Sequence, residues 1–156
     1  MSLVKVKEYL KRYNADDRII VLDESSASVK EAAHALNTSD GAIAKSIAVM
    51  INDKPVVIVL AGDRKLDNHK FKETFHVKAR MISYEETEAL TGHAPGGVCP
   101  FGLNDEVSVY LDESLKEHEY VYPACGSSNS AIKLSIDEIE KFSNPVRWVD
   151  VGKVME

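Results

Sequence analysis

Residues 43–61 read IAKSIAVMINDKPVVIVLA, two apolar segments around a polar turn. Ile43 to Ile51 and Pro55 to Ala61 are rich in branched residues that favour strands, and Asn52-Asp53-Lys54 has the composition of a tight connection. The sequence therefore predicts a central β-hairpin, and the other elements can be placed outward from it.

Helical and strand patterns alternate on both sides of this hairpin. Apolar residues at helical spacing, with Ser or Asp where a cap is needed, predict helices, and short apolar runs predict strands. Helices are expected at 3–13, 28–36, 67–75, 83–92 and 135–142, and further strands at 18–22, 106–111, 120–123 and 147–151. We expect an α/β fold of the α+β type, a single domain over 1–156. Its sheet should be mixed, largely antiparallel, curved or barrel-like, and surrounded by helices.

The composition limits the classes of function. A chain of 156 residues with 44% hydrophobic content can bury one core without disulfides or metals. Cys99 and Cys125 lie far apart and form no Cys-x-x-Cys motif, which indicates a reducing cytoplasm, and no apolar run is long enough for a membrane span. The net charge of −6 argues against indiscriminate nucleic-acid binding, so any RNA contact should be local.

Lys45 is the first candidate for chemistry. Alternation along 43–51 places it on the same face as Ile43, Ile47 and Val49. Burying an ammonium without a partner is costly, so the group must reach a cleft, pair with a carboxylate or have a lowered pKa. Two interpretations stay open. The stem packs while the amine reaches water, or the amine serves a cleft as a cation or base.

Two irregular segments are the other candidates. The segment 91–102, TGHAPGGVCPFG, holds four of the eight glycines and two of the five prolines, so its backbone could be aimed at a ligand or could form a rigid connection. It lacks the spacing of a dinucleotide or P-loop motif. The segment 125–130, CGSSNS, follows an apparent strand, and its hydroxyls could bind a ribose or an amino acid or could satisfy a turn.

Other chemistries have less support in the sequence. A nucleophilic cysteine would need a neighbouring base, and no local motif joins Cys99 or Cys125 to one of the five histidines. Those histidines are too scattered for a His-x-x-x-His motif, so no metal site is expected.

Taken together, these segments resemble the YbaK/EbsC family of aminoacyl-tRNA deacylases, which is related to the editing domain inserted in bacterial prolyl-tRNA synthetases. The resemblance covers nearly the whole chain. It is carried by 28–36, Ile43-Ala44-Lys45-Ser46, Ala61-Gly62-Asp63, 91–93 with 96–102, and Gly126-Ser127-Ser128. It implies that water hydrolyses the ester between an amino acid and the terminal adenosine of tRNA, without a metal or organic cofactor.

The resemblance also assigns roles to residues. Lys45 matches the family's key lysine and would hold the terminal phosphate or ribose, and Gly96 to Pro100 matches its Gly-x-x-x-Pro loop. The backbone of Gly96 and Gly97 would orient water and polarise the ester carbonyl. The residues expected to bind substrate are His93, Pro100, Gly126, Ser127, Ser128 and Asn129.

The resemblance does not identify a single amino-acid substrate, and it implies two kinds of partner. Some relatives that remove alanine carry a histidine near the third segment, where this chain has residues 125–129, so alanine, serine, threonine and cysteine esters all fit. The expected partner is a tRNA acceptor end carrying an amino acid, with an aminoacyl-tRNA synthetase as a second partner that could aid capture. The alternative is a non-catalytic module that binds an amino acid or aminoacyl-tRNA and docks a synthetase.

Overall fold

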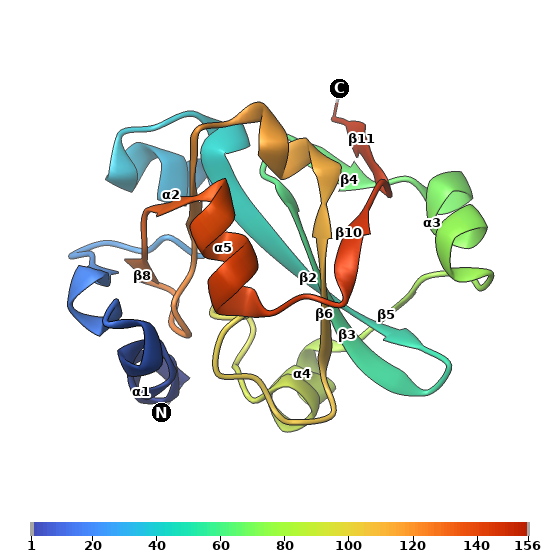
Figure 1. Ribbon diagram of the computed structural model, residues 1–156, viewed down its shortest axis with the longest axis horizontal. Helices are drawn as coiled ribbons and strands as arrows, with labels where there is room; N and C mark the ends of the chain where they lie inside the picture. The colour runs from blue at the N-terminus through green and yellow to red at the C-terminus, as the bar shows by residue number, and fades with distance from the viewer. Residues whose placement is uncertain (1, 156) are drawn as a thin grey trace.

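The hairpin over residues 43–61 lies at the centre of the fold in a computed structural model that describes residues 2–155 (Figure 1). Strands β2 (Ile43–Ile51) and β3 (Lys54–Ala61) pair antiparallel from Ala44 opposite Ala61 to Ile51 opposite Lys54. Asn52 and Asp53 have φ values of 51° and 64°, the left-handed conformation that a two-residue hairpin turn requires. The predicted hairpin is therefore confirmed.

The hairpin is extended on both sides into a curled, mixed sheet with the order β10-β6-β3-β2-β7-β9, while β5 also pairs with β2. The additional strands are β5 (Arg80–Met81), β6 (Ser108–Asp112), β7 (Tyr120–Pro123), β9 (Leu134–Ser135) and β10 (Arg147–Val149). Two short ribbons complete the strands: β1 (Ile20–Val21) with β8 (Ser130–Ala131), and β4 (Arg64–Leu66) with β11 (Gly152–Val154). The predicted mixed α/β class is confirmed.

The sheet differs from the expected one in how strands joined by short loops are placed. β6 and β7 follow one another closely in the chain, yet they lie on opposite sides of the hairpin, each parallel to its neighbour. The 3₁₀ turn between them, Glu113–Glu117, crosses the end of β3, where the Ala61 N–H donates to Ser114 Oγ at 3.0 Å. β10 also pairs parallel with β6, so the central sheet is less antiparallel than expected.

The helices largely match their sequence signals. They are α1 (Ser2–Leu10), α2 (Val29–Leu36), α3 (Asn68–Phe75), α4 (Tyr84–Thr91) and α5 (Ile136–Ser143). Ser28 and Ser135 form capping boxes, and Asp67 caps α3 through two backbone N–H groups. The first helix continues only as a 3₁₀ turn over 11–13, and the strand expected over 18–22 is reduced to β1 because 16–18 form a second 3₁₀ turn. No helix among residues 2–155 is long and apolar enough to cross a membrane.

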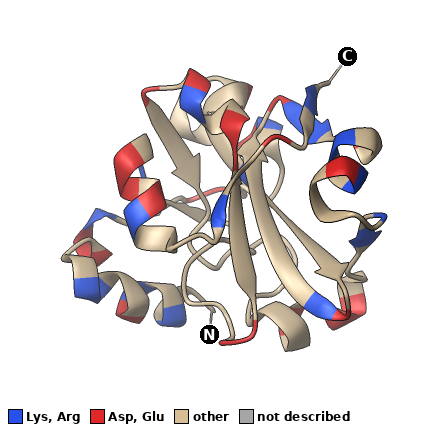
Figure 2. Cartoon of the chain, turned by 45° about the vertical axis from the view of Figure 1, so that its right-hand side comes forward, with Lys and Arg blue, Asp and Glu red and all other residues tan. Residues whose placement is uncertain are grey.

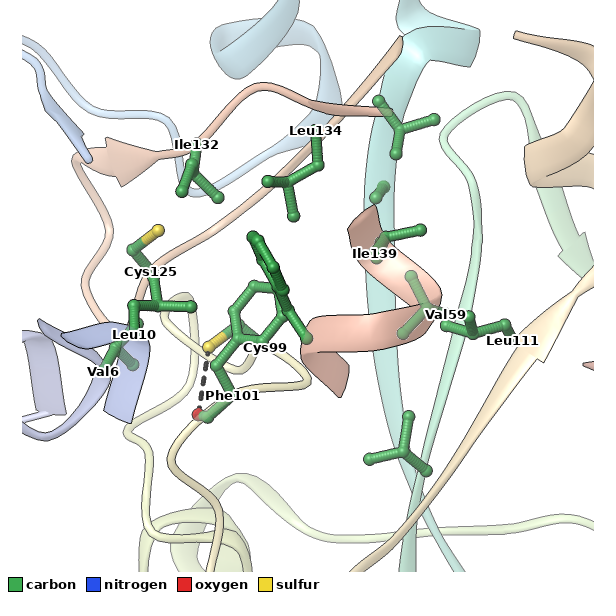
Figure 3. Close-up of a cluster of buried hydrophobic side chains, with 14 of the residues drawn as sticks. Val6, Leu10, Val59, Cys99, Phe101, Leu111, Cys125, Ile132, Leu134 and Ile139 are labelled. Atoms are coloured by element: carbon green, nitrogen blue, oxygen red, sulfur yellow. Dashed lines mark hydrogen bonds between the residues drawn. The ribbon is translucent and has the colours of Figure 1, made fainter. Parts of the chain in front are cut away.

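Two apolar clusters lie on opposite faces of the sheet, while charged residues of both signs occupy the surrounding helices and connections (Figure 2). The first cluster joins α1 and α5 to the sheet and contains both cysteines (Figure 3). The second packs α3 on the other face through Phe71, which is fully buried against residues such as Ile58 and Leu60. Because β3 contributes to both clusters, its residues 55–61 are all buried, which explains its continuous apolar sequence.

A salt bridge between Arg18 and Glu138 on α5 should make stability depend on acidity. Two hydrogen bonds from Arg18, at 2.7 and 3.1 Å, are the main reason that the pKa of Glu138 falls from 4.5 to about 2, and the Ser135 N–H adds to the effect. A pKa lowered in the folded state stabilises the fold above pH 4.5, and this contribution is lost as the pH falls towards about 2.

We therefore expect Glu138→Gln to lower the melting temperature at neutral pH and to flatten its decline at acid pH. Melting curves recorded from about pH 7 to about pH 2.5 would show this. Glu119→Gln, at an exposed position, serves as the control. Equal acid sensitivity in wild type and Glu138→Gln would contradict the assignment.

Candidate functional site

A cavity opens where the edge of β2 changes partner. β7 pairs with β2 only at Ile43 and Ala44, and β5 takes the same edge at Val49 and Met50. The cavity between these pairings has a volume of about 170 Å³. It is lined by 26–29 and Ala32, by Ile43 to Ser46 of β2, by Gly96 and Val98, by Tyr122 and Ala124, and by Ser130 and Ala131. Strand ends and helix starts from distant parts of the sequence thus meet around one small space.

Lys45 lies between this cavity and a second one. The second cavity has a volume of about 340 Å³ and shares Val29 and Lys45 with the first. The Lys45 amine donates to the Arg64 carbonyl oxygen and lies 3.8 Å from Met155 Sδ. Burial lowers the pKa of Lys45, and the nearby Asp63 carboxylate partly opposes this effect. Lys45 thus lines both cavities, and its amine bonds to a backbone carbonyl.

The glycine-rich loop reaches the cavity through its backbone. Gly96 lines the cavity and has a φ of 88°, a conformation that favours glycine. At Gly97 a Cβ atom would lie 2.7 Å from the carbonyl carbon and oxygen of Gly126. No side chain larger than hydrogen fits between these two backbones, so the loop and the third segment are in direct main-chain contact.

The polar groups of the third segment hold neighbouring loops. Ser127 Oγ lies 3.0 Å from Asn129 Oδ1, and Asn129 Nδ2 donates to the Leu22 carbonyl at 3.1 Å. The Ser128 carbonyl accepts from the Ser26 N–H at 2.6 Å. Of this segment only Ser130 lines the cavity, together with Ala131 directly after it, and the expected Gly126, Ser127, Ser128 and Asn129 do not.

His93 and Pro100 also differ from their expected positions, because both are buried away from the cavity lining. His93 is fully enclosed, with Nε2 2.7 Å from the Phe101 carbonyl oxygen, and Thr91 Oγ1 bonds to both backbone groups of His93. Burial lowers the pKa of His93, which favours the neutral ring. In this geometry His93 fixes the ends of the loop instead of touching a ligand in the cavity.

The cysteines are placed poorly for nucleophilic chemistry. Cys99 and Cys125 are both fully buried in the first apolar cluster (Figure 3). Burial raises the pKa of Cys99 to about 12 and raises that of Cys125 well above its usual value. Although His93 Nε2 lies 3.6 Å from Cys99 Sγ, both thiols strongly favour the protonated, unreactive form.

Several residues at the cavity have only weak signals in the sequence. Ser46 lies beside Lys45, and its Oγ is buried without a hydrogen-bond partner among residues 2–155. Tyr122 and Ala124 could have been found as the end of a strand, and the segment 26–29 as the residues around the N-cap of a helix. Across the described residues, no group of three or more His, Cys, Asp or Glu side chains is arranged to bind a metal ion.

Comparison with known proteins adds independent findings. A family model described as an aminoacyl-tRNA editing domain matches residues 23–142. The uncharacterised protein YwhH of Bacillus subtilis is 45% identical over 157 residues, which cover all of both chains. EbsC of Enterococcus faecalis, named as a candidate Cys-tRNA(Pro)/Cys-tRNA(Cys) deacylase, is 28% identical over 123 residues, 78% of this chain and 75% of EbsC.

Two further matches concern prolyl-tRNA synthetase. The proline–tRNA ligase of Bacillus subtilis is 29% identical over 90 residues, which are 57% of this chain and 16% of the ligase, so the similarity covers one part of that enzyme. A crystal structure described as a candidate trans-editing enzyme for prolyl-tRNA synthetase has a TM-score of 0.88 at 27% identity and covers 97% of both chains.

The close contact between the glycine-rich loop and the third segment predicts that alanine substitutions at Gly96 and Gly97 lower the free energy of unfolding by different amounts. Gly96→Ala meets its nearest neighbours at an ordinary 3.6 Å, so its cost should be limited to the strain of positive φ, about 1–2 kcal/mol. Gly97→Ala must displace the Gly126 backbone and should lower the free energy of unfolding by more, roughly 3 kcal/mol. Urea unfolding of both variants tests this order. A Gly97→Ala variant as stable as Gly96→Ala would show that the loops do not pack so closely.

Proposed function

The chain belongs to the aminoacyl-tRNA editing domain family, and we propose that it is a trans-editing deacylase that hydrolyses the ester of mischarged aminoacyl-tRNA and releases a small amino acid. The observation that carries this proposal is the position of Lys45 between a small cavity and a larger one. An aminoacyl-tRNA ester joins an aminoacyl group to the terminal ribose of the RNA. The two cavities could hold these two groups, with the Lys45 ammonium between them.

The smaller cavity suits the aminoacyl group. Its volume of about 170 Å³ is several times the roughly 30 Å³ that one water molecule occupies in the liquid, so it has room for a small amino acid. Its lining includes Ala27, Ala124 and Ala131 together with Ser26, Ser28, Ser46 and Ser130. Alanine, serine, threonine and cysteine esters are the proposed substrates. The cysteine named in the description of EbsC falls within this group.

Lys45 and the glycine-rich loop would have separate roles in the reaction. The Lys45 amine would exchange its contact with the Arg64 carbonyl for the terminal phosphate or ribose of the RNA and so fix the ester in place. The exposed backbone of Gly96, supported by the enclosed Gly97, would orient the attacking water and polarise the ester carbonyl. An activated ester needs positioning more than strong acid or base groups, and this proposal requires neither a metal nor an organic cofactor.

The remaining predicted site residues would shape the site without touching the ester. His93 and Pro100 would hold the loop, and Gly126 would allow its close approach. Ser127, Ser128 and Asn129 would fix residues 22–26 beside the cavity through the contacts already described. Their substitution should therefore alter substrate position and stability together.

The proposed partner is the acceptor end of a tRNA that carries the wrong amino acid. An aminoacyl-tRNA synthetase that hands over this RNA is a further proposed partner, supported by the similarity to a described trans-editing enzyme for prolyl-tRNA synthetase. The cytoplasm, where tRNA is charged and used, is the proposed location.

A panel of tRNAs charged with the wrong amino acid tests the function. Purified protein should release free amino acid from alanyl, seryl, threonyl or cysteinyl esters. Lys45→Ala should lower kcat/KM by about 10² to 10³-fold, because a positioned cation is lost from the site. Scintillation counting of remaining aminoacyl-tRNA gives the rates.

Lys54→Ala provides the matched control, since Lys54 is exposed at the distant hairpin turn and should behave as wild type. Wild-type activity in a folded Lys45→Ala variant would remove Lys45 from its role. Binding of the RNA without turnover by the wild type would instead favour the non-catalytic module.

The cysteines should be dispensable for this reaction. Because both thiols are buried and have raised pKa values, Cys99→Ala combined with Cys125→Ala should retain the catalytic rate once folding is verified. Iodoacetamide treatment of the folded wild type should likewise leave deacylation intact. Loss of turnover in the folded double variant would instead support a mechanism in which a cysteine thiol is the nucleophile.

A further inference from the structure

The ribbon of β4 and β11 carries a pair of lysines that the proposed reaction does not use. Lys65 and Lys153 are direct cross-strand partners, so their side chains project from the same face, and both are exposed. Like charges placed opposite one another destabilise a strand pair. The ribbon therefore keeps two positive charges together at some cost to its own stability.

The opposite face of this ribbon is attached to the body of the protein. Leu66 packs against the second apolar cluster, and Arg64 pairs with Glu117 at 2.9 Å. Lys70 Nζ donates to the Gly152 carbonyl at 2.9 Å, and the Asp67 N–H donates to the Val151 carbonyl at 2.8 Å. These contacts fix the ribbon, so the Lys65–Lys153 pair faces away from the core in a defined position.

The same ribbon is connected to the candidate site. The Lys45 amine donates to the carbonyl of Arg64, the residue immediately before Lys65. At the other strand, the Met155 N–H donates to the Asp63 carbonyl at 3.0 Å, and both residues line the second cavity. The end of the ribbon therefore borders the second cavity on the side of Lys45.

The two ribbon lysines have no carboxylate partner of their own among the described residues. Lys30, Lys70 and Lys116 each form an ion pair, whereas Lys65 and Lys153 form none within residues 2–155. The Asp67 carboxylate accepts hydrogen bonds from the Lys70 and His69 backbone N–H groups in the first turn of α3, which lower its pKa. The charge of Lys153 contributes to the lowered pKa, but Asp67 forms no ion pair with Lys153. Figure 2 shows basic positions on β4, β11 and α3 near the C-terminus with acidic positions among them, and Asp112, Glu113, Glu117 and Asp150 line the pocket that includes Lys153.

We propose that Lys65 and Lys153 bind the phosphodiester backbone of the aminoacylated RNA where its 3′ strand leaves the site. This inference rests on the proposed function, and it names the surface that captures the RNA partner. Two adjacent ammonium groups complement successive phosphates, and contacts of this kind position a nucleic acid without reading its sequence. They also explain how an acidic protein can bind RNA through a local surface.

The test measures binding of an uncharged RNA hairpin with a single-stranded 3′ tail, at salt concentrations from about 50 to about 300 mM. Losing two contacts to a single strand should reduce the slope of log affinity against log salt by about 1.4 in Lys65→Ala/Lys153→Ala. Lys65→Arg/Lys153→Arg should restore the wild-type slope. Lys7→Ala/Lys54→Ala, with two exposed lysines far from the ribbon, is the matched control.

An unchanged slope in the folded Lys65→Ala/Lys153→Ala variant, or an equal reduction in the control, would overturn the inference. The binding assay needs no turnover, so its failure can be separated from failure of the proposed function. If wild type binds RNA through the lysine pair but hydrolyses none of the charged panel, the deacylase proposal fails and the RNA surface stands. If wild type deacylates with a slope independent of the pair, only the RNA surface fails.

Discussion

The contact of three backbones at Gly97, Gly126 and Ser2 is the constraint on which the site depends. A Cβ atom on Gly97 would lie 2.7 Å from Gly126, and one on Gly126 would lie 2.6 Å from the carbonyl oxygen of Ser2. The glycine-rich loop, the third segment and the start of α1 are therefore stacked without intervening side chains. This stacking encloses Cys99 and Cys125 in the core and leaves Gly96 facing the cavity.

A second constraint places the ammonium group of Lys45. The edge of β2 pairs with β7 for only two residues, so the first cavity can open beside Lys45 where the backbone pairing has ended. Gly62 allows the Asp40 backbone to approach, since a Cβ there would lie 2.1 Å from the Asp40 carbonyl oxygen. That approach brings Asp63 and Asp40 to the second cavity beside Lys45. The Arg64 carbonyl and the Asp63 carboxylate offset part of the cost of burying the amine, although its pKa remains lowered.

The sequence predicted features that are governed by near neighbours. The hairpin, the caps at Ser28 and Ser135, and the face of Lys45 follow from periodicity and from spacings of a few residues. It could not show that His93 is enclosed or that Asn129 bonds to Leu22, because such contacts join residues far apart in the chain. Polar residues in a loop have the same sequence signature whether they face a ligand or hold another loop. The sequence likewise did not show that β6 and β7 pair parallel with opposite sides of the hairpin, because the short connection between them suggests adjacent antiparallel strands.

In the proposed function, the selection of an amino acid and the capture of RNA would depend on different parts of the structure. At physiological ionic strength, exposed charges interact weakly beyond about 8 Å, so acidic residues on distant surfaces repel a bound phosphate only slightly. A few lysines near the site can then outweigh a net charge of −6. The small cavity is lined mainly by short side chains and in the proposed function would discriminate by size and hydrogen bonding, whereas the ribbon carries the two exposed charges of Lys65 and Lys153. If both proposals hold, substitutions on the ribbon would change the affinity for RNA and leave the amino-acid preference, which the small cavity would determine, unchanged.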